Sequence, residues 1–399
     1  MTHRPVCRLE LDDDSFVDDP YPGFARARAE HPVGWHDASS LWLVTSHEHC
    51  SALLRDRRFG RLWADRQPVR RFEPFNVLHR NQMMENEPPQ HTRLRRKVST
   101  AFARGHVERM RPRVQVLGRQ LLSAVDGHKF DVLADFAEPL PVLVIAELLG
   151  APTADAAQLR AWSQAIVSMY ERPAPQRDVE DAALAASADF ADYMRSLIEQ
   201  RRASLCGDLL SDLVRAQAGD DGLTDDEVLA TAILLLNAGH EASVNVFGNG
   251  LVALLHAPEQ YRRLAERRLP VEVAVEEMLR FDSALQLFER TATTDVDVAG
   301  VTIKAGERIG VLLGAANRDP AVFASPDELD LGRHPNPHLA FGAGVHFCLG
   351  APLARMELAE SLRLLSSSYP RLRLSGEPTR RPTFVLRGYV EVPVCGSSK

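Results

Sequence analysis

The stretch from Phe341 to Gly350 reads F-G-A-G-V-H-F-C-L-G and places one cysteine, Cys348, in a loop with three glycines. Glycine tolerates positive backbone dihedral angles and close approach of other groups, so this loop can turn tightly around the sulfur. Backbone N–H groups in such a turn can point at a thiolate and lower its pKa, which suits an iron ligand. For a lone cysteine beside a glycine turn, an ordinary buried residue is the more usual interpretation. The loop taken by itself leaves both interpretations open.

The whole string resembles the heme-binding loop of the cytochrome P-450 family, whose pattern F-G-x-G-x-H-x-C-x-G is met at every fixed position. The resemblance implies that Cys348 is the thiolate ligand of the iron in heme b. It implies that Phe341, Gly342 and Gly350 shape the loop and that His346 meets a heme propionate. The expected cofactors are heme b, with O2 as co-substrate and NAD(P)H acting indirectly through redox partners.

The composition is that of an ordinary globular protein: 399 residues, 25% charged, 45% hydrophobic, with a formal charge of -7. This charge speaks against nucleic-acid binding, and no run approaches the roughly 18 apolar residues of a membrane span. The five scattered cysteines form neither a disulfide framework nor a zinc cluster. We expect a monomeric cytoplasmic protein with one domain over residues 1–399 and no nucleic-acid or membrane partner.

Helical patterns dominate the chain. Thr224 and Glu227 form a capping box, and the residues after it are apolar on nearly all sides over 228–236, which predicts a long buried helix that continues past 250. Further helices are predicted over 271–281 and 352–368.

Strand signals are fewer. A short β pattern at 41–45 and apolar runs near 296–303 and 308–313 can pair with one another, and the stretch 59–90 is rich in turn residues. We expect a mainly α fold with a small β portion. The resemblance implies the single-domain cytochrome P-450 fold, a triangular prism with a long central helix over the heme.

The sequence E-M-L-R places Glu277 and Arg280 three residues apart on one helix face, where they can form an ion pair. Such a pair is usually solvated. The resemblance implies instead a buried structural triad, completed by Arg333 between this helix and the cysteine loop.

Propionate contacts are implied at three more positions. His91 and Arg95 lie four apart in P-P-Q-H-T-R-L-R-R, and Arg290 stands in F-E-R-T. Two carboxylates buried beside a heme need cationic partners, because an unpaired buried charge is costly.

The long helix carries A-G-H-E-A-S at 238–243, which resembles the oxygen-binding stretch of the family. An acid followed by a threonine is usual there, and the threonine hydroxyl helps to deliver protons during O2 activation. Here Glu241 is followed by Ala242, with Ser243 one place later. Three explanations remain open: the substrate supplies a hydroxyl, Ser243 rotates in, or the chemistry depends less on the threonine. Glu241 is then the remaining proton-relay acid.

Alignment to the family places the substrate pocket beside the stretch 60–85, on the long helix and on two later loops. Asn237 and Gln286 are notable because a polar side chain in an apolar pocket normally meets a specific ligand group, although packing roles fit equally well. Arginines crowd 57–80 and hint at an acidic or carrier-bound substrate, but a solvated face explains them more simply. The predicted substrate residues are Leu234, Asn237, Ala238, Leu285, Gln286, Leu287 and Val385.

The implied function is that of a heme-thiolate monooxygenase, an oxidoreductase that hydroxylates or epoxidises a specialised metabolite such as a polyketide or a peptide. No glycine-rich dinucleotide motif accompanies the chain, so electrons should come from a ferredoxin and a ferredoxin reductase. A basic helix over 93–104, with Arg355, is the expected docking face. The alternatives are an oxidative coupling enzyme, a peroxide-driven peroxygenase, and a non-catalytic heme sensor or ligand carrier.

Overall fold

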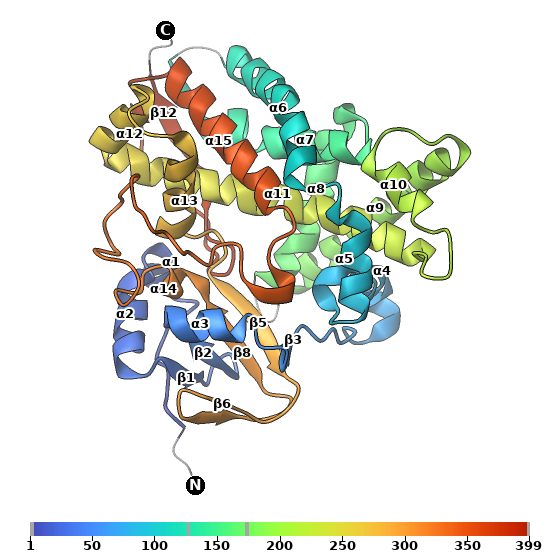
Figure 1. Ribbon diagram of the computed structural model, residues 1–399, viewed down its shortest axis with the longest axis horizontal. Helices are drawn as coiled ribbons and strands as arrows, with labels where there is room; N and C mark the ends of the chain where they lie inside the picture. The colour runs from blue at the N-terminus through green and yellow to red at the C-terminus, as the bar shows by residue number, and fades with distance from the viewer. Residues whose placement is uncertain (1–3, 126–127, 172–174, 397–399) are drawn as a thin grey trace.

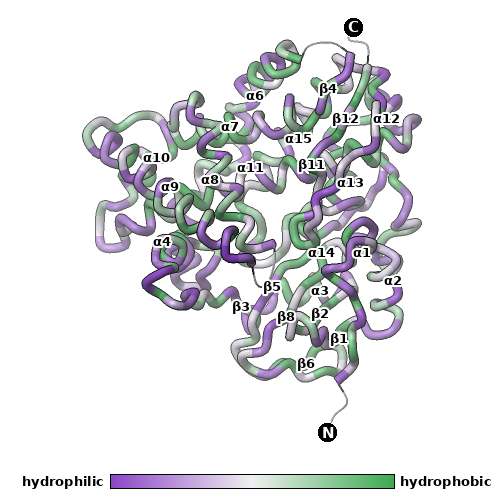
Figure 2. The backbone as a smooth tube through the Cα atoms, turned by 180° about the vertical axis from the view of Figure 1, so that it is seen from behind, coloured by the Kyte–Doolittle hydropathy of each residue, from purple (hydrophilic) through white to green (hydrophobic). Residues whose placement is uncertain are grey.

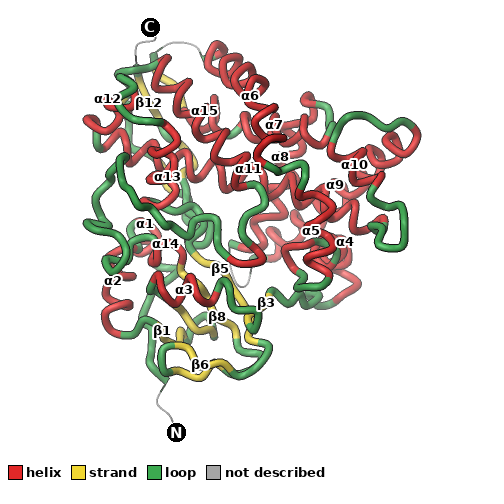
Figure 3. Tube along the Cα trace, in the orientation of Figure 1, coloured by secondary structure: helices red, strands yellow, loops and turns green. Residues whose placement is uncertain are grey.

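The computed structural model describes residues 4–125, 128–171 and 175–396. Helices predominate, and the largest group of strands lies near the N-terminus (Figure 3), which confirms the mainly α prediction. The helices are α1 (Asp14–Asp18), α2 (Tyr21–Glu30), α3 (His47–Leu53), α4 (Val69–Arg80), α5 (Gln90–Ser99), α6 (Arg104–Ala124), α7 (Pro139–Leu149), α8 (Ala156–Val167), α9 (Arg177–Ala203), α10 (Leu209–Arg215), α11 (Asp225–His256), α12 (Pro258–Ala265), α13 (Val271–Phe281), α14 (Leu313–Ala316) and α15 (Ala351–Ser368). Shorter helical turns are η1 (Met83–Glu85), η2 (Leu133–Ala137), η3 (Thr153–Asp155), η4 (Ser168–Tyr170) and η5 (Gly344–His346).

The main sheet has the strand order β1-β2-β8-β5-β3, with β2 parallel to β8. The predicted runs at 41–45 and 308–313 therefore pair with each other. The run 296–303 folds back on itself as the hairpin β6–β7, because Ala299 and Gly300 both adopt the positive φ angles of a tight hairpin turn. The strands are β1 (Val33–His36), β2 (Leu41–Val44), β3 (Phe59–Gly60), β4 (Lys129–Asp131), β5 (Leu287–Ala292), β6 (Val296–Val298), β7 (Val301–Ile303), β8 (Arg308–Leu312), β9 (Arg373–Leu374), β10 (Thr379–Arg380), β11 (Tyr389–Glu391) and β12 (Pro393–Cys395).

Helix α11 runs through the middle of the molecule (Figure 1). Its start is fixed by the predicted capping box: the Thr224 hydroxyl accepts from the Glu227 amide, and the Glu227 carboxylate accepts from the Thr224 amide at 3.0 Å. Most of its residues are buried on every side, as their apolar sequence predicts. Figure 2 shows hydrophobic residues concentrated along α7 and α11, whereas α4 is largely hydrophilic.

Two predicted segments differ from the structure. The basic stretch 93–104 is not one helix, because α5 ends at Ser99 and the chain turns to bury Phe102 before α6 begins at Arg104. The turn-rich stretch 59–90 contains helix α4, whose buried Phe72, Phe75 and Leu78 recur at helical spacing among its arginines.

Among the described residues, no helix combines the length and the apolar character needed to cross a lipid bilayer.

Helix α13 packs against α11 at Gly250. A Cβ atom at this position would lie 2.7 Å from Cβ of Met278 and 2.4 Å from its Cε. Real Cβ contacts are not this short, so glycine is what permits the two helices to approach this closely. The position of α13 matters because this helix carries Glu277 and Arg280.

We predict that Gly250→Ala lowers the free energy of unfolding by about 1–3 kcal/mol, the usual cost of overpacking a core. Gly105→Ala is the matched control, because Gly105 lies in α6, where an added Cβ would meet no atom within 4 Å. This second change should be neutral or stabilising through the higher helix propensity of alanine. Urea unfolding of both variants measures the difference, and equal effects would contradict the role of Gly250 in the close approach of the two helices.

Candidate active site

The cysteine loop turns directly before α15. Gly344 has φ 72°, and a Cβ there would lie 2.2 Å from the carbonyl oxygen of Leu54, so this position requires glycine. Gly342 also has a positive φ, of 68°. Gly350 differs from the expectation for a turn glycine: its φ is -78°, and it is the N-cap residue of α15. The Cys348 amide donates to the Phe341 carbonyl at 2.9 Å, which closes the loop.

The sulfur of Cys348 sits at the start of α15. Burial raises the pKa of the Cys348 thiol, while amide hydrogen bonds from Gly350 and Ala351 and the charges of Arg95 and Arg355 act in the opposite direction. The sulfur of this half-buried cysteine therefore has hydrogen-bond donors and positive charge around it. A bound cation would offset the burial, which fits a thiolate that ligates a metal.

Helix α5 holds His91 and Arg95 on one face beside this loop. Arg95 donates to the Phe347 carbonyl at 2.8 Å, and the His91 ring centroid lies 4.5 Å from that of His346. His91 is buried, and its Nδ1 has no hydrogen-bond partner among the described residues. Burial, helped by the nearby His346 and Arg95, lowers the pKa of His91 to about 4.

Arg290, from strand β5, is 2% exposed and stacks on Phe288 at 4.2 Å. Its Nη1 donates to the Glu289 carbonyl, but Nη2 is buried and finds no partner in the part of the chain that the structure describes. Burial, followed by repulsion from Arg61, lowers the pKa of Arg290 to about 9. Glu87 and Glu85 act on it in the opposite direction, but neither bonds to Nη2, so an anionic group at this atom would stabilise the guanidinium.

His346 donates through Nε2–H to Oε1 of Glu87 at 2.8 Å. Burial alone would raise the pKa of Glu87, but the His346 contact and the Arg61 amide outweigh it and lower that pKa. Glu87 was not predicted from the sequence. The one signal for it is its position just before the two prolines that precede the His91 helix.

Glu277 and Arg280 form a fully buried ion pair at 2.8 Å. Arg333 donates to both Glu277 oxygens at 3.2 Å, so the structure brings the three predicted residues together. Arg280 also donates to the carbonyls of Asn317 and Pro326, which fixes the loop that follows α14. The arrangement joins α13 to the chain that leads into the cysteine loop.

Helix α11 presents Leu234, Ala238 and Ala242 at four-residue spacing, hence on one face. Ala238 is exposed although it lies in the middle of a buried helix, and Ala242 is half-buried. Asn237, also half-buried, has an Oδ1 without a partner within the described residues. Ser243 donates to the Gly239 carbonyl of its own helix at 3.5 Å, which occupies its hydroxyl.

Glu241 is buried and paired with Arg381, whose Nη1 lies 2.6 Å from Oε1 of the carboxylate. Arg381, which comes from the segment between β10 and β11, was not predicted from the sequence. The repeated arginines of R-R-P-T carry no indication of which one turns inward.

Gln286 and Leu287, which were predicted to line the substrate pocket, are buried in the protein core. Gln286 is fully buried and donates to the Ser283 carbonyl at 2.6 Å, with its Oε1 where a Cβ of Gly314 would stand. Leu287 packs in the core cluster that includes Phe16 and Leu312. Leu285 and Val385 are half-buried. Val385 packs against the same cluster as Leu287, and Leu285 bridges to Leu386.

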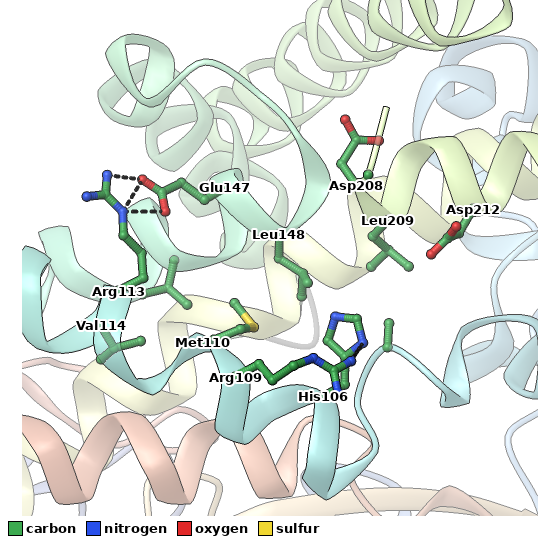
Figure 4. A pocket seen from close by; sticks show the side chains of 13 residues that line it. His106, Arg109, Met110, Arg113, Val114, Glu147, Leu148, Asp208, Leu209 and Asp212 are labelled. Carbon is green, nitrogen blue, oxygen red and sulfur yellow. Dashed lines mark hydrogen bonds and ion pairs between the residues drawn. The ribbon is translucent and has the colours of Figure 1, made fainter. Parts of the chain in front are cut away.

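A pocket of about 290 Å³ opens between α6, α7 and α10 (Figure 4). Met110, Val114 and Leu148 form apolar parts of its wall, and Arg113 pairs with Glu147 beside it. None of the residues predicted for the active site lines this pocket.

Residues 40–366 match the family model described as Cytochrome P450. The chain therefore belongs to the cytochrome P450 family and is a heme-dependent monooxygenase that uses O2. Nocardicin C N-oxygenase of Nocardia uniformis subsp. tsuyamanensis is 41% identical, and the match covers 94% of this chain and 95% of that protein. Mycinamicin IV hydroxylase/epoxidase of Micromonospora griseorubida is 40% identical, with 92% and 91% covered.

Among solved structures, P450BioI in complex with an acyl carrier protein ligated to hexadec-9Z-enoic acid superimposes with a TM-score of 0.92. It is 35% identical, and the match covers 96% of this chain and 99% of that chain.

Glu276, next to the triad, ties α13 to α15 and to the cysteine loop. It pairs with Arg355 at 2.6 Å and with His338 at 2.9 Å, and Arg355 stacks on Phe341. Burial raises the pKa of Glu276, but the bonds from His338 and Arg355 outweigh it and lower the pKa from 4.5 to about 2. Because the folded-state pKa is lowered, this contribution to stability is present above pH 4.5 and is lost as the pH falls toward 2.

We predict that Glu276→Gln destabilises the fold at about pH 6 and that its difference from the natural chain narrows at about pH 3. Urea unfolding at both pH values measures this. Glu377→Gln, which removes the same charge from an exposed position, serves as the control. An equal difference at both pH values for Glu276→Gln would show that these ion pairs do not stabilise the loop.

Proposed function

We propose that this protein inserts one oxygen atom of O2 into a small organic substrate by hydroxylation or epoxidation, and releases the second atom as water. The observation that carries this proposal is a pair of buried, unpartnered nitrogen atoms whose residues both neighbour the His346–Glu87 pair of the cysteine loop. Arg290 Nη2 and His91 Nδ1 are buried and unpartnered within the described residues. Anionic groups brought by a cofactor would satisfy both.

Cys348 would ligate the iron of heme b, and His91, Arg95, Arg290 and His346 would hold its propionates. Bound heme supplies the activation of O2. The protein contributes the amide donors around the sulfur and the cations that surround the carboxylates. His346 would contact a propionate while its Nε2 remains bonded to Glu87 at 2.8 Å.

The substrate would lie between α11 and the loop that carries Val385. Leu234, Asn237, Ala238 and Leu285 are the residues that we assign to this space. A specialised metabolite such as a polyketide or a peptide is the proposed class, and relatives named for nocardicin C and mycinamicin IV support it. Asn237 Oδ1, unpartnered within the described residues, would accept a hydrogen bond from a substrate donor.

Proton delivery would involve Glu241 and a hydroxyl group of the substrate. Ala242 has no hydroxyl, and that of Ser243 is turned to its own helix. Both facts favour the substrate as the source of the missing group over rotation of Ser243.

Electrons would come from NAD(P)H through a ferredoxin reductase and a ferredoxin. The docking face would include the exposed end of α5 and the start of α6. Arg355 would contribute less to ferredoxin binding than the sequence predicts, because its charge is already neutralised by Glu276. The arginines at 57–80 are also largely paired, for example Arg71 with Asp181 and Arg80 with Asp65, which favours a structural or solvated role.

The test is turnover under ¹⁸O2 with ferredoxin, ferredoxin reductase and NADPH. Candidate substrates are macrolactones and cyclic peptides that shift the heme spin state on binding. We expect one ¹⁸O atom per product and no product without reductant. An oxidised product without ¹⁸O would favour oxidative coupling, turnover by hydrogen peroxide alone would favour a peroxygenase, and binding without turnover would contradict the proposal.

A further inference from the structure

Glu241 is held from outside its own helix. Arg381 is separated from it by 140 positions, and its side chain is only 18% exposed. An arginine that is mostly buried and reaches a buried carboxylate at 2.6 Å fixes the orientation of that carboxylate. The ion pair therefore determines where the acid of α11 points.

The segment that carries Arg381 is a closed loop. The Arg381 amide donates to the Gly388 carbonyl at 3.0 Å, and the Thr383 hydroxyl donates to the Leu386 carbonyl at 2.8 Å. The loop is also attached to residues 284–286: the Arg387 amide donates to Ala284, and the Gln286 amide donates to Val385. Hydrogen bonds therefore join the backbone at Val385, residues 284–286 and Arg381 in one closed loop.

The two oxygens of Glu241 have different surroundings. Oε1 is bound by Arg381, whereas Oε2 faces Nε2 of the buried His240 at 3.5 Å. The His240 Nδ1 lies 3.3 Å from the Leu236 carbonyl, and its Nε2 makes no hydrogen bond within the described residues. Oε2 is therefore the oxygen that remains available to exchange a proton.

Two charged groups outside α11, Arg160 and Glu138, also act on His240. The ion pair of Arg160 and Glu138 acts on it from α8 and from the residue before α7, and the Arg160 side chain is 37% exposed. Burial lowers the pKa of His240, so its ring is neutral near pH 7. A neutral ring beside Oε2 leaves Arg381 as the cation that directly balances the Glu241 charge.

We propose that Arg381 is a positioning residue that holds the Glu241 carboxylate in place for proton delivery and connects it to the substrate-facing loop at Val385. This inference rests on the proposed function, because it assigns Glu241 to that reaction. A substrate that displaces Val385 would shift Arg381 and thereby alter the carboxylate that serves the oxygen chemistry. Substrate specificity and proton delivery would then be coupled through the loop that carries both Arg381 and Val385.

The test is infrared spectroscopy of the carboxyl region in the holoenzyme near pH 7. In Arg381→Met the buried carboxylate loses its cation, so Glu241 should take up a proton and give a protonated-carboxyl band equal to one group per chain. Burial raises the pKa of Glu357 well above its usual range, so the signal to follow is the part of the band that depends on Glu241. This part should be absent from the natural chain and from Arg381→Lys, and it should disappear from Arg381→Met when Glu241→Gln is added. Arg381→Gln tests the same loss of charge if Arg381→Met does not fold.

Arg380→Met is the matched control. Arg380 has a side chain that is 19% exposed and pairs with Asp18 and Asp282 instead of Glu241. This variant should give no band that depends on Glu241. A missing band in the neutral Arg381 variants, or an equal Glu241-dependent band in Arg380→Met, would overturn the proposal. The infrared result does not depend on turnover, so it can fail or succeed separately from the proposed function.

Discussion

The rest of the site depends on the hydrogen bonds and ion pairs that the buried carboxylate of Glu277 accepts. Arg280 and Arg333 donate to it from two directions, and the amide of Asp330 adds a third donor at 2.9 Å. Removing one partner of such a network leaves an uncompensated buried charge at a cost of about 3–5 kcal/mol. The network holds the irregular chain between α14 and the cysteine loop against α13, and this chain has little regular structure of its own.

The buried polar groups around the cysteine loop differ from Glu277 in having unpartnered atoms. Glu277 is satisfied within the protein, whereas Arg290 and His91 are buried with atoms that find no partner in the described ranges. A buried guanidinium nitrogen or imidazole nitrogen without a partner is unfavourable, which supports our proposal that anionic groups of the heme meet them. The Glu277 network thus completes its own ion pairs, whereas Arg290 and His91 would complete theirs with the two carboxylates of the proposed cofactor.

Local sequence patterns predicted the long helix at Thr224, the helix of Glu277 and the turn at Cys348, because each is fixed by residues a few positions apart. Glu87 and Arg381 were not predictable in this way. They contact residues 259 and 140 positions away, and no local period records such a pairing. The core position of Gln286 was not predictable from local sequence either, because it depends on a bond to the Ser283 carbonyl and on the space that Gly314 leaves for the side chain.

We propose that Cys348 binds heme iron through its thiolate. The most direct test of this claim is the carbon monoxide difference spectrum of the dithionite-reduced protein, recorded together with Cys348→Ala. We predict a Soret band at about 450 nm that is lost in the variant. A band at about 420 nm in the intact protein, unchanged by Cys348→Ala, would mean that another residue ligates the iron and would contradict the claim.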